Sequence, residues 1–185
     1  MHHDPAEYEW HVAHERAAKD VYFRTSPHSP IPPSERPSFE GLAYYAIDPR
    51  LRFEGLRLTP LSAGEEATIE IATSDGGTRQ ARRLGSLEFA LGQARRRLVA
   101  YELGAGDGSL FVPFLDATSG PETYGAGRYL DIEPEADGTY VLDLNRAYQP
   151  LCAYAPNFSC PLTPAENRLP ERIEAGERLA PVAVR

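Results

Sequence analysis

The chain has 185 residues, 42% of them hydrophobic and 25% charged, with a formal net charge of −8 at neutral pH. This size and balance are typical of one soluble globular domain that buries its own core. The acidic balance disfavours nucleic acid as a partner, because neutralising phosphates requires a basic face. No apolar run approaches the roughly 20 residues of a membrane span, and the charged N-terminus is unlike a signal peptide. We therefore expect a cytoplasmic protein without nucleic-acid or membrane partners.

An N-terminal helix is predicted over residues 4–25. Asp4 is a typical cap, Pro5 suits the first helical position, and Glu7 follows three residues after the cap. The apolar residues that recur at helical spacing are Trp10, Ala13, Ala17 and Val21. We expect this face to bury Trp10 against the outside of a sheet.

The rest of the chain is expected to form one β domain, so that residues 1–185 make a single domain. Five prolines exclude regular structure from a strap over residues 26–38. Short alternating runs separated by turn residues fill residues 39–167. The expected strands are residues 42–47, 51–58, 68–73, 79–84, 86–91, 95–103, 109–115, 128–132 and 139–144. About nine strands at this spacing favour a mainly β fold, an antiparallel barrel or sandwich. Residues 168–185 form a C-terminal segment rich in proline and glutamate, and its last residues are expected to be a surface strand or a loose tail.

A glycine-rich turn is the first candidate for a binding site. It comprises Tyr124, Gly125, Gly127, Arg128 and Tyr129. Glycines allow backbone amides to approach a ligand closely. The planar guanidinium of the arginine can donate two parallel hydrogen bonds to a carboxylate or phosphate. The Gly-x-Gly lacks the third glycine of a dinucleotide site. A tight turn in which Arg128 pairs with a nearby acid is the equally weighted alternative.

The following segments add polar groups to this candidate. Asp143 and Asn145 share a face by the two-residue period of a strand, and Tyr148 follows. A buried asparagine has four hydrogen-bonding positions, so it either orients a neighbouring loop or recognises a ligand through hydrogen bonds.

Neither the cysteines nor the histidines predict a metal site. Cys152 and Cys160 form no Cys-x-x-Cys motif, and we expect buried free thiols, with a disulfide as the second choice. His11 and His14 lie three residues apart on the helix without a third ligand, which favours two solvated imidazoles.

Linked motifs reveal a resemblance to a known family. They read T-S-G-x-x-T-Y-G-A-G-R-Y-L, D-L-N-x-A-Y-x-P-x-C-A-Y, C-P-L-x-P-x-E-N-x-L and I-x-A-G-E. The start of the chain adds Trp10, Arg16, Lys19, Asp20, Ser29, Pro30, Arg36, Phe39, Gly41, Leu42 and Tyr44. This combination resembles the microbial domain-of-unknown-function family numbered sixteen eighty-four. The resemblance implies little about function because the family is uncharacterised, but it implies that the central residues, from Tyr124 to Asn167, belong to one pattern.

The most favoured function is binding of a small carboxylate or phosphate in a pocket of tyrosines and arginine. The expected ligand-binding residues are Tyr124, Gly125, Gly127, Arg128, Tyr129, Asn145, Tyr148, Glu166 and Asn167. One alternative is an enzyme that uses Tyr124 or Tyr148 with Glu166 or Asp143 for acid–base chemistry. The other is a scaffold without a ligand. No cofactor and no metal are predicted, and the oligomeric state stays open.

Overall fold

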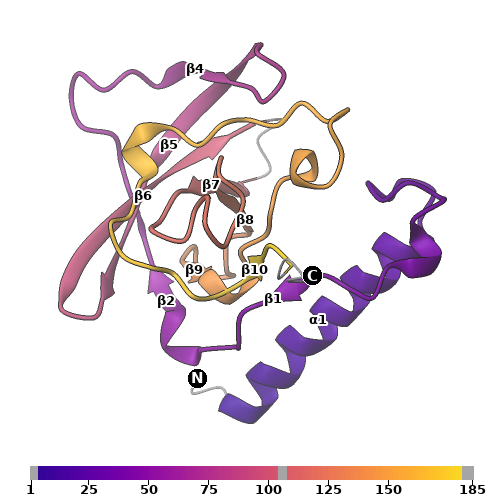
Figure 1. The fold of residues 1–185 in the computed structure, drawn as a ribbon. Helices are drawn as coiled ribbons and strands as arrows, with labels where there is room; N and C mark the ends of the chain where they lie inside the picture. The colour runs from indigo at the N-terminus through magenta and orange to yellow at the C-terminus, as the bar shows by residue number, and fades with distance from the viewer. Residues whose placement is uncertain (1–3, 104–107, 181–185) are drawn as a thin grey trace.

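One long helix lies against a β domain built from three antiparallel sheets (Figure 1). The structure is a computed structural model that describes residues 4–103 and 108–180. The helix is α1 (Pro5–Thr25), and the strands are β1 (Ala43–Tyr44), β2 (Arg52–Leu56), β3 (Leu58–Thr59), β4 (Thr68–Ala72), β5 (Thr78–Leu91), β6 (Ala94–Glu102), β7 (Leu110–Phe114), β8 (Arg128–Ile132), β9 (Tyr140–Asp143) and β10 (Glu177–Arg178). Short 3-10 helices occur at Arg36–Ser38, Pro49–Leu51, Leu144–Arg146, Leu151–Ala153 and Ala165–Asn167. The prediction of a mainly β fold with one N-terminal helix is confirmed.

The largest sheet has the order β3-β5-β6-β7-β8, and β4 pairs with the first half of β5. Where the sequence predicts two strands, 79–84 and 86–91, the chain forms one long strand, β5, whose register shifts between Arg83 and Gly85. Gly85 has φ +146°, and a Cβ there would lie 2.3 Å from the carbonyl oxygen of Thr59. The glycine therefore marks a bulge inside a continuous strand rather than a turn.

The central strands are buried on both faces. Leu98 and Ala100 of β6 belong to one core cluster, whereas Val99 and Tyr101 face a second cluster on the opposite side. The first cluster also contains Leu110, Val112 and Phe114, which share one face of β7 as predicted. Over the described residues the sheets do not close into the barrel that the sequence left possible. The two-stranded sheets β2–β9 and β1–β10 stand apart from the large sheet in the pairing pattern.

Helix α1 buries a different face from the one predicted. The Asp4 side chain caps the helix by accepting from the Ala6 amide at 3.0 Å, as expected. Tyr8, Val12 and Phe23 are its buried residues, whereas Trp10 is 55% exposed. Trp10 lies about 200° around the helix from Tyr8. The prediction was wrong because the inward face mixes apolar and charged residues, including Arg16 and Lys19, which apolar periodicity does not detect.

Trp10 gives a direct test of this orientation. It is the only tryptophan of the chain, so its fluorescence reports on the outer face of α1 alone. We expect an emission maximum close to that of tryptophan in water, and efficient quenching by iodide in the native protein. A blue-shifted emission that moves to longer wavelength only on unfolding would contradict an exposed Trp10.

Several described residues after Asn167 are part of the interior. Ile173 and Ala175 are fully buried, and Glu177 is 1% exposed. β10 pairs antiparallel with β1, and Leu115 forms a parallel bridge with Arg168. The pairing partner of this short segment lies far away in the sequence, so no local pattern predicts its burial. The prediction of a surface strand or loose tail concerns the last residues, of which 181–185 lie outside the described residues.

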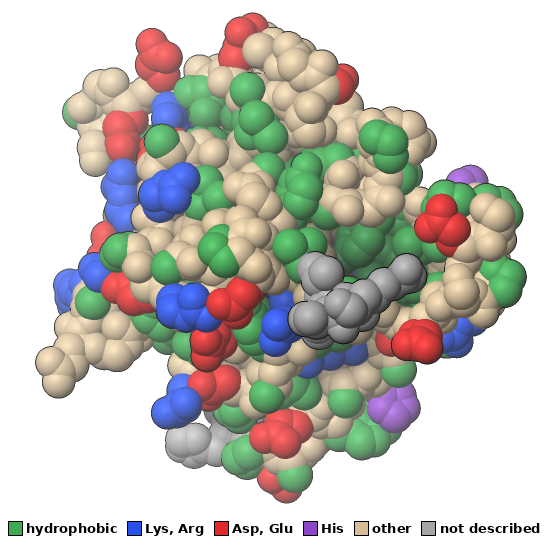
Figure 2. All heavy atoms as spheres, viewed as in Figure 1, with side chains coloured by type: hydrophobic (Ala, Val, Ile, Leu, Met, Phe, Trp, Pro, Cys, Tyr) green, Lys and Arg blue, Asp and Glu red, His purple; other side chains and the backbone are tan. Residues whose placement is uncertain are grey.

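The surface carries charges of both signs. Figure 2 shows basic and acidic side chains interspersed on one face of the molecule. Of the arginine run at the start of β6, Arg96 pairs with Glu171, and Arg97 lies 3.8 Å from Glu65. Among the described residues, no helix has the length and apolar character to cross a bilayer.

Candidate functional site

Arg128, the central residue of the predicted pocket, lies in the protein interior. Its side chain and that of Asp116 both have 0% exposure and form an ion pair at 2.7 Å. The guanidinium also donates to the carbonyl oxygens of Ile173 at 2.9 Å, of Glu177 at 3.2 Å, and of Ala175. Burial lowers the pKa of Arg128, and Asp116 opposes that shift. Arg128 thus binds the backbone of residues 173–177 and holds it in place. Of the two roles predicted for Arg128, pairing with a nearby acid describes these contacts better than binding the anion of a ligand.

The two glycines of the turn differ in what they permit. Gly127 has φ +104°, and a Cβ there would lie 2.4 Å from Thr163 Oγ1 and 2.6 Å from the Phe114 carbonyl oxygen. The closest atom to a Cβ at Gly125 is 3.9 Å away. Close protein packing is therefore enough to require glycine at position 127.

Both asparagines are saturated by the protein. Asn145 accepts from the Asp48 amide at 2.8 Å and donates to the Asp48 carbonyl at 2.8 Å and to Tyr8 Oη at 2.9 Å. Asn167 accepts from the Val99 amide at 2.8 Å and donates to the Val99 carbonyl at 2.8 Å. It also donates to the Pro113 carbonyl at 2.7 Å, so one side chain ties β6 to β7. Of the two predicted roles for a buried asparagine, orienting a neighbouring segment is the one formed.

The remaining predicted residues also have partners inside the chain. The hydroxyl of Tyr129 donates to the Pro161 carbonyl, and that of Tyr148 donates to Asp131 at 2.6 Å. Tyr124 Oη lies 3.6 Å from Cys152 Sγ.

The acid–base alternative does not gain support from these contacts. Glu166 accepts from Arg83 and Tyr101, and Asp143 accepts from Tyr8 at 2.8 and 2.9 Å. The two tyrosines and two carboxylates named for the enzyme alternative thus form hydrogen bonds with other side chains and not with one another.

A cavity of about 200 Å³ lies elsewhere, in the seam between α1 and the β domain. Arg16 and Lys19 line it from α1, Tyr44 from β1 and Glu177 from β10. Tyr44 and Glu177 stand directly opposite each other in the β1–β10 pair, so their side chains share one face of that sheet. Tyr148 and Asn145 of the predicted set also line this cavity, and the other seven predicted residues do not.

Glu177 is the best-connected group of the seam. One carboxylate oxygen accepts from the single lysine, Lys19, and the other accepts from the Gln149 amide at 2.8 Å and from Tyr154 Oη at 2.7 Å. The Lys19 ammonium also lies 4.9 Å from the centre of the Tyr148 ring. Burial and the Glu177 carboxylate raise the pKa of Tyr154. Lys19 uses one of its three donors on Glu177, and its side chain is 30% exposed.

Arg16 and Tyr44 carry polar atoms without a partner. Arg16 donates to the carbonyl oxygens of Tyr45 at 2.9 Å and Asn145 at 3.1 Å, but forms no ion pair with any described carboxylate. Its Nε and the Tyr44 hydroxyl are buried and have no hydrogen-bond partner among residues 4–103 and 108–180. The guanidinium lies 4.5 Å from the centre of the Tyr44 ring. Burial lowers the pKa of Arg16, and burial followed by the field of Glu177 raises that of Tyr44. The other buried side-chain atoms without a partner in the described residues are Nε of Arg128 and Nε of Arg178, which do not line this cavity. Native structures leave few such atoms unsatisfied, and two of them meet here, so this seam is a candidate binding site.

The sequence predicted no binding role for Arg16, Lys19 or Tyr44, although all three belong to the family resemblance. A usable signal was the inward face of α1, where Tyr8, Val12, Arg16, Lys19 and Phe23 recur at spacings of three and four. Two cations, Arg16 and Lys19, on an otherwise apolar helical face predict a partner group in the protein interior. That partner, Glu177, could not be identified from the sequence, because the two-residue strand that carries it has no periodic pattern.

Two larger cavities, each of about 550 Å³, lie side by side and share Arg52, Glu135 and Val141. Their cations are already compensated: Arg52 pairs with Glu54, and Arg146 pairs with Glu15 at 2.9 Å and with Asp143 at 3.3 Å. Of the described residues, none that carries a buried polar atom without a partner lines either cavity. In the described part of the chain, no three His, Cys, Asp or Glu side chains are grouped to hold a metal ion.

Comparison with known proteins agrees with the overall fold and adds no function. The solution NMR structure of an uncharacterized protein of Haloarcula marismortui is similar to the chain, with 37% sequence identity and a TM-score of 0.71. The similarity covers 97% of this chain and 98% of that one. No curated protein matches the chain. The sequence pattern of a family described as "Protein of unknown function (DUF1684)" matches residues 37–178. The resemblance noted from the motifs is thereby confirmed, and the chain belongs to the DUF1684 family.

Proposed function

We propose that the protein binds a small anionic ligand, a carboxylate or a phosphate, in the seam between α1 and the β domain. The observation that carries this proposal is the half-buried Arg16, a cation that has neutral carbonyls as its direct partners and a buried Nε without any. A desolvated charge is costly unless a counter-charge compensates it. An anion in the adjoining cavity would supply that counter-charge.

The charge balance of the cavity supports an anion over a cation. Lys19 and Glu177 compensate each other, as do Arg146 and Glu15 at the rim. Arg16 is left as the cation without a directly paired acid, although Glu177 and Asp143 offset part of its charge at longer range. The lining therefore carries a net positive charge inside a protein of net charge −8.

The donors of the seam match an oxygen-rich ligand. Tyr44 offers a hydroxyl that has no partner, and Lys19 retains two donors beyond its bond to Glu177. Charge-assisted hydrogen bonds of this kind are about twice as strong as neutral ones. A cavity of about 200 Å³ suits a ligand of few heavy atoms.

Binding is tested by thermal shift and calorimetry with acetate, small dicarboxylates and inorganic phosphate, compared between wild type and Arg16→Gln. We expect at least one compound to stabilise the wild type. We expect Arg16→Gln to weaken its binding by about 1.5–3 kcal/mol, which is roughly tenfold to a hundredfold in affinity. Arg24→Gln removes the same charge from the exposed end of the same helix, so it is the matched control and should bind like the wild type.

Tyr44→Phe separates binding from folding, since it removes only a hydroxyl that forms no hydrogen bond within the described part of the ligand-free protein. We expect unchanged or slightly higher stability without ligand, and weaker binding with it. The proposal is wrong if no carboxylate or phosphate stabilises the wild type, or if both Arg16→Gln and Tyr44→Phe bind as the wild type does. In that case the scaffold without a ligand stays as the prediction from the sequence. The cytoplasmic location is a separate prediction from the sequence, which this experiment does not test.

A further inference from the structure

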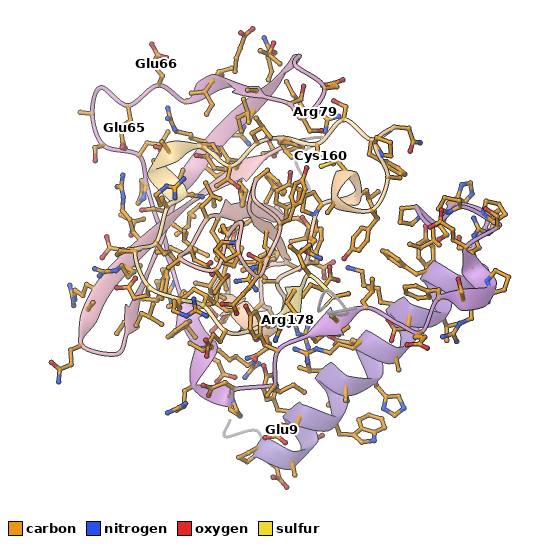
Figure 3. The ribbon with its side chains drawn as sticks, in the orientation of Figure 1. Glu9, Glu65, Glu66, Arg79, Cys160 and Arg178 are labelled. Carbon is orange, nitrogen blue, oxygen red and sulfur yellow. The ribbon has the colours of Figure 1, made fainter. Side chains whose placement is uncertain are left out.

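Cys152 and Cys160 form a second cluster of reactive groups, outside the seam. The Cys152 amide donates to Cys160 Sγ at 3.3 Å, and Cys152 Sγ donates to Tyr124 Oη at 3.6 Å. Both cysteines are free, with Cys160 buried at 7% exposure and Cys152 half-buried. Figure 3 labels Cys160 on the segment that follows the 3-10 helix Leu151–Ala153. One thiol is therefore reachable from solvent, and the other lies beside it in the interior.

The backbone around Cys160 is held by hydrogen bonds from another part of the chain, which keep its sulfur next to the Cys152 amide. The Cys160 amide donates to Ser74 Oγ at 3.0 Å, and the Ser74 amide donates to the Cys160 carbonyl at 2.9 Å. These bonds attach Cys160 to the turn between β4 and β5, independently of the loop that carries Cys152. Burial, and then a contact from the Cys152 side chain, raise the pKa of the Cys160 thiol to about 11.

We propose that Cys152 and Cys160 are a reversible dithiol–disulfide pair that reacts with a low-molecular-weight disulfide such as glutathione disulfide. The thiolate of the accessible Cys152 attacks one sulfur of glutathione disulfide, forms a mixed disulfide and releases one glutathione. Cys160 then gives up its proton and attacks Cys152 Sγ, which closes the protein disulfide and releases the second glutathione. The protein loses two hydrogens and two electrons, and glutathione disulfide is reduced to two glutathione molecules.

The order of attack follows from access and acidity. A thiol whose pKa is about 11 supplies little thiolate at neutral pH, and its sulfur is shielded from solvent. Cys160 is thus the resolving cysteine, for which proximity to the mixed disulfide compensates for low acidity. The proposal does not depend on anion binding in the seam.

The experiment equilibrates the native protein in glutathione buffers of increasing oxidised fraction, blocks free thiols and measures the intact mass. For the wild type we expect a monomer that has lost two hydrogens, has no blockable thiol and returns to the dithiol with dithiothreitol. Closing the 152–160 loop should also raise the melting temperature by roughly 5–10 °C.

Two single variants assign the roles. Cys160→Ser should stop at one glutathione on Cys152, and Cys152→Ser should stay unmodified while folded because Cys160 is buried. Both variants should remain folded, as judged by the backbone signal in far-ultraviolet circular dichroism. The proposal is overturned if the wild type stays reduced, accumulates stable glutathione adducts, or forms only disulfides between chains. It is also overturned if Cys152→Ser reacts as fast as Cys160→Ser.

Discussion

Replacing Arg128 with methionine is expected to lower the free energy of unfolding by about 3–5 kcal/mol. The substitution leaves Asp116 as a buried charge without its partner and frees the carbonyl oxygens of Ile173 and Ala175. Breaking one side of a buried ion pair is costly because the remaining charge cannot regain its hydration. With a total stability of about 5–15 kcal/mol for a typical protein, we expect a large fall in the urea midpoint.

The double variant Arg128→Met with Asp116→Leu tests the cause of this loss. Removing both charges eliminates the unpaired carboxylate, so part of the stability should return. Arg172 is the exposed comparison: it pairs with Glu122 on the surface, and Arg172→Met should change the urea midpoint little. A native-like midpoint for Arg128→Met would show that this ion pair does not hold the C-terminal segment. Had Arg128 bound an external anion, its loss would weaken binding rather than folding.

Substituting alanine for Gly127 is expected to cost about 3 kcal/mol or more, which is the second largest effect. The residue has φ +104°, a region that an L-residue enters only at a cost of about 1–2 kcal/mol. In addition, its methyl group would lie 2.4 Å from Thr163 Oγ1 and 2.6 Å from the Phe114 carbonyl oxygen. The backbone atom cannot move without breaking the pairing of β7 with β8.

Gly125→Ala is the matched control in the same turn. It lies two residues away, has no positive φ, and a Cβ there would find its closest neighbour at 3.9 Å. We expect its melting temperature to stay within a few degrees of wild type, while that of Gly127→Ala falls well below. Equal effects at the two positions would contradict the packing that the structure assigns to Gly127.

These expectations separate two kinds of residue that the sequence pattern presents together. Arg128, Gly127, Asn145 and Asn167 bond to the protein itself and hold segments that are distant in the chain. The seam between α1 and the β domain instead has Arg16, whose described partners are neutral carbonyls, and the Tyr44 hydroxyl, which has no hydrogen-bond partner among the described residues. Substitutions in the first group are expected to change stability, whereas Tyr44→Phe in the second is expected to change binding.

The sequence by itself determined the elements whose signals are local. Asp4 and Pro5 start the helix within one turn, and the alternation of Thr68–Ala72 with the following turn specifies a hairpin. These patterns depend on neighbours a few residues away, so no tertiary information is needed to read them. The linked motifs also identified the family from the sequence alone.

The tertiary structure decided everything that depends on a distant partner. The inward face of α1 was set by Asp143, which binds Tyr8 across 135 residues, and not by the apolar stripe of Trp10. Whether Arg128 meets a ligand or an acid depended on where Asp116 and the C-terminal carbonyls lie. The seam needed the pairing of Tyr44 with Glu177, in two strands of two residues each. Such short strands have no periodicity of their own, and their position is fixed only by the core that forms around them.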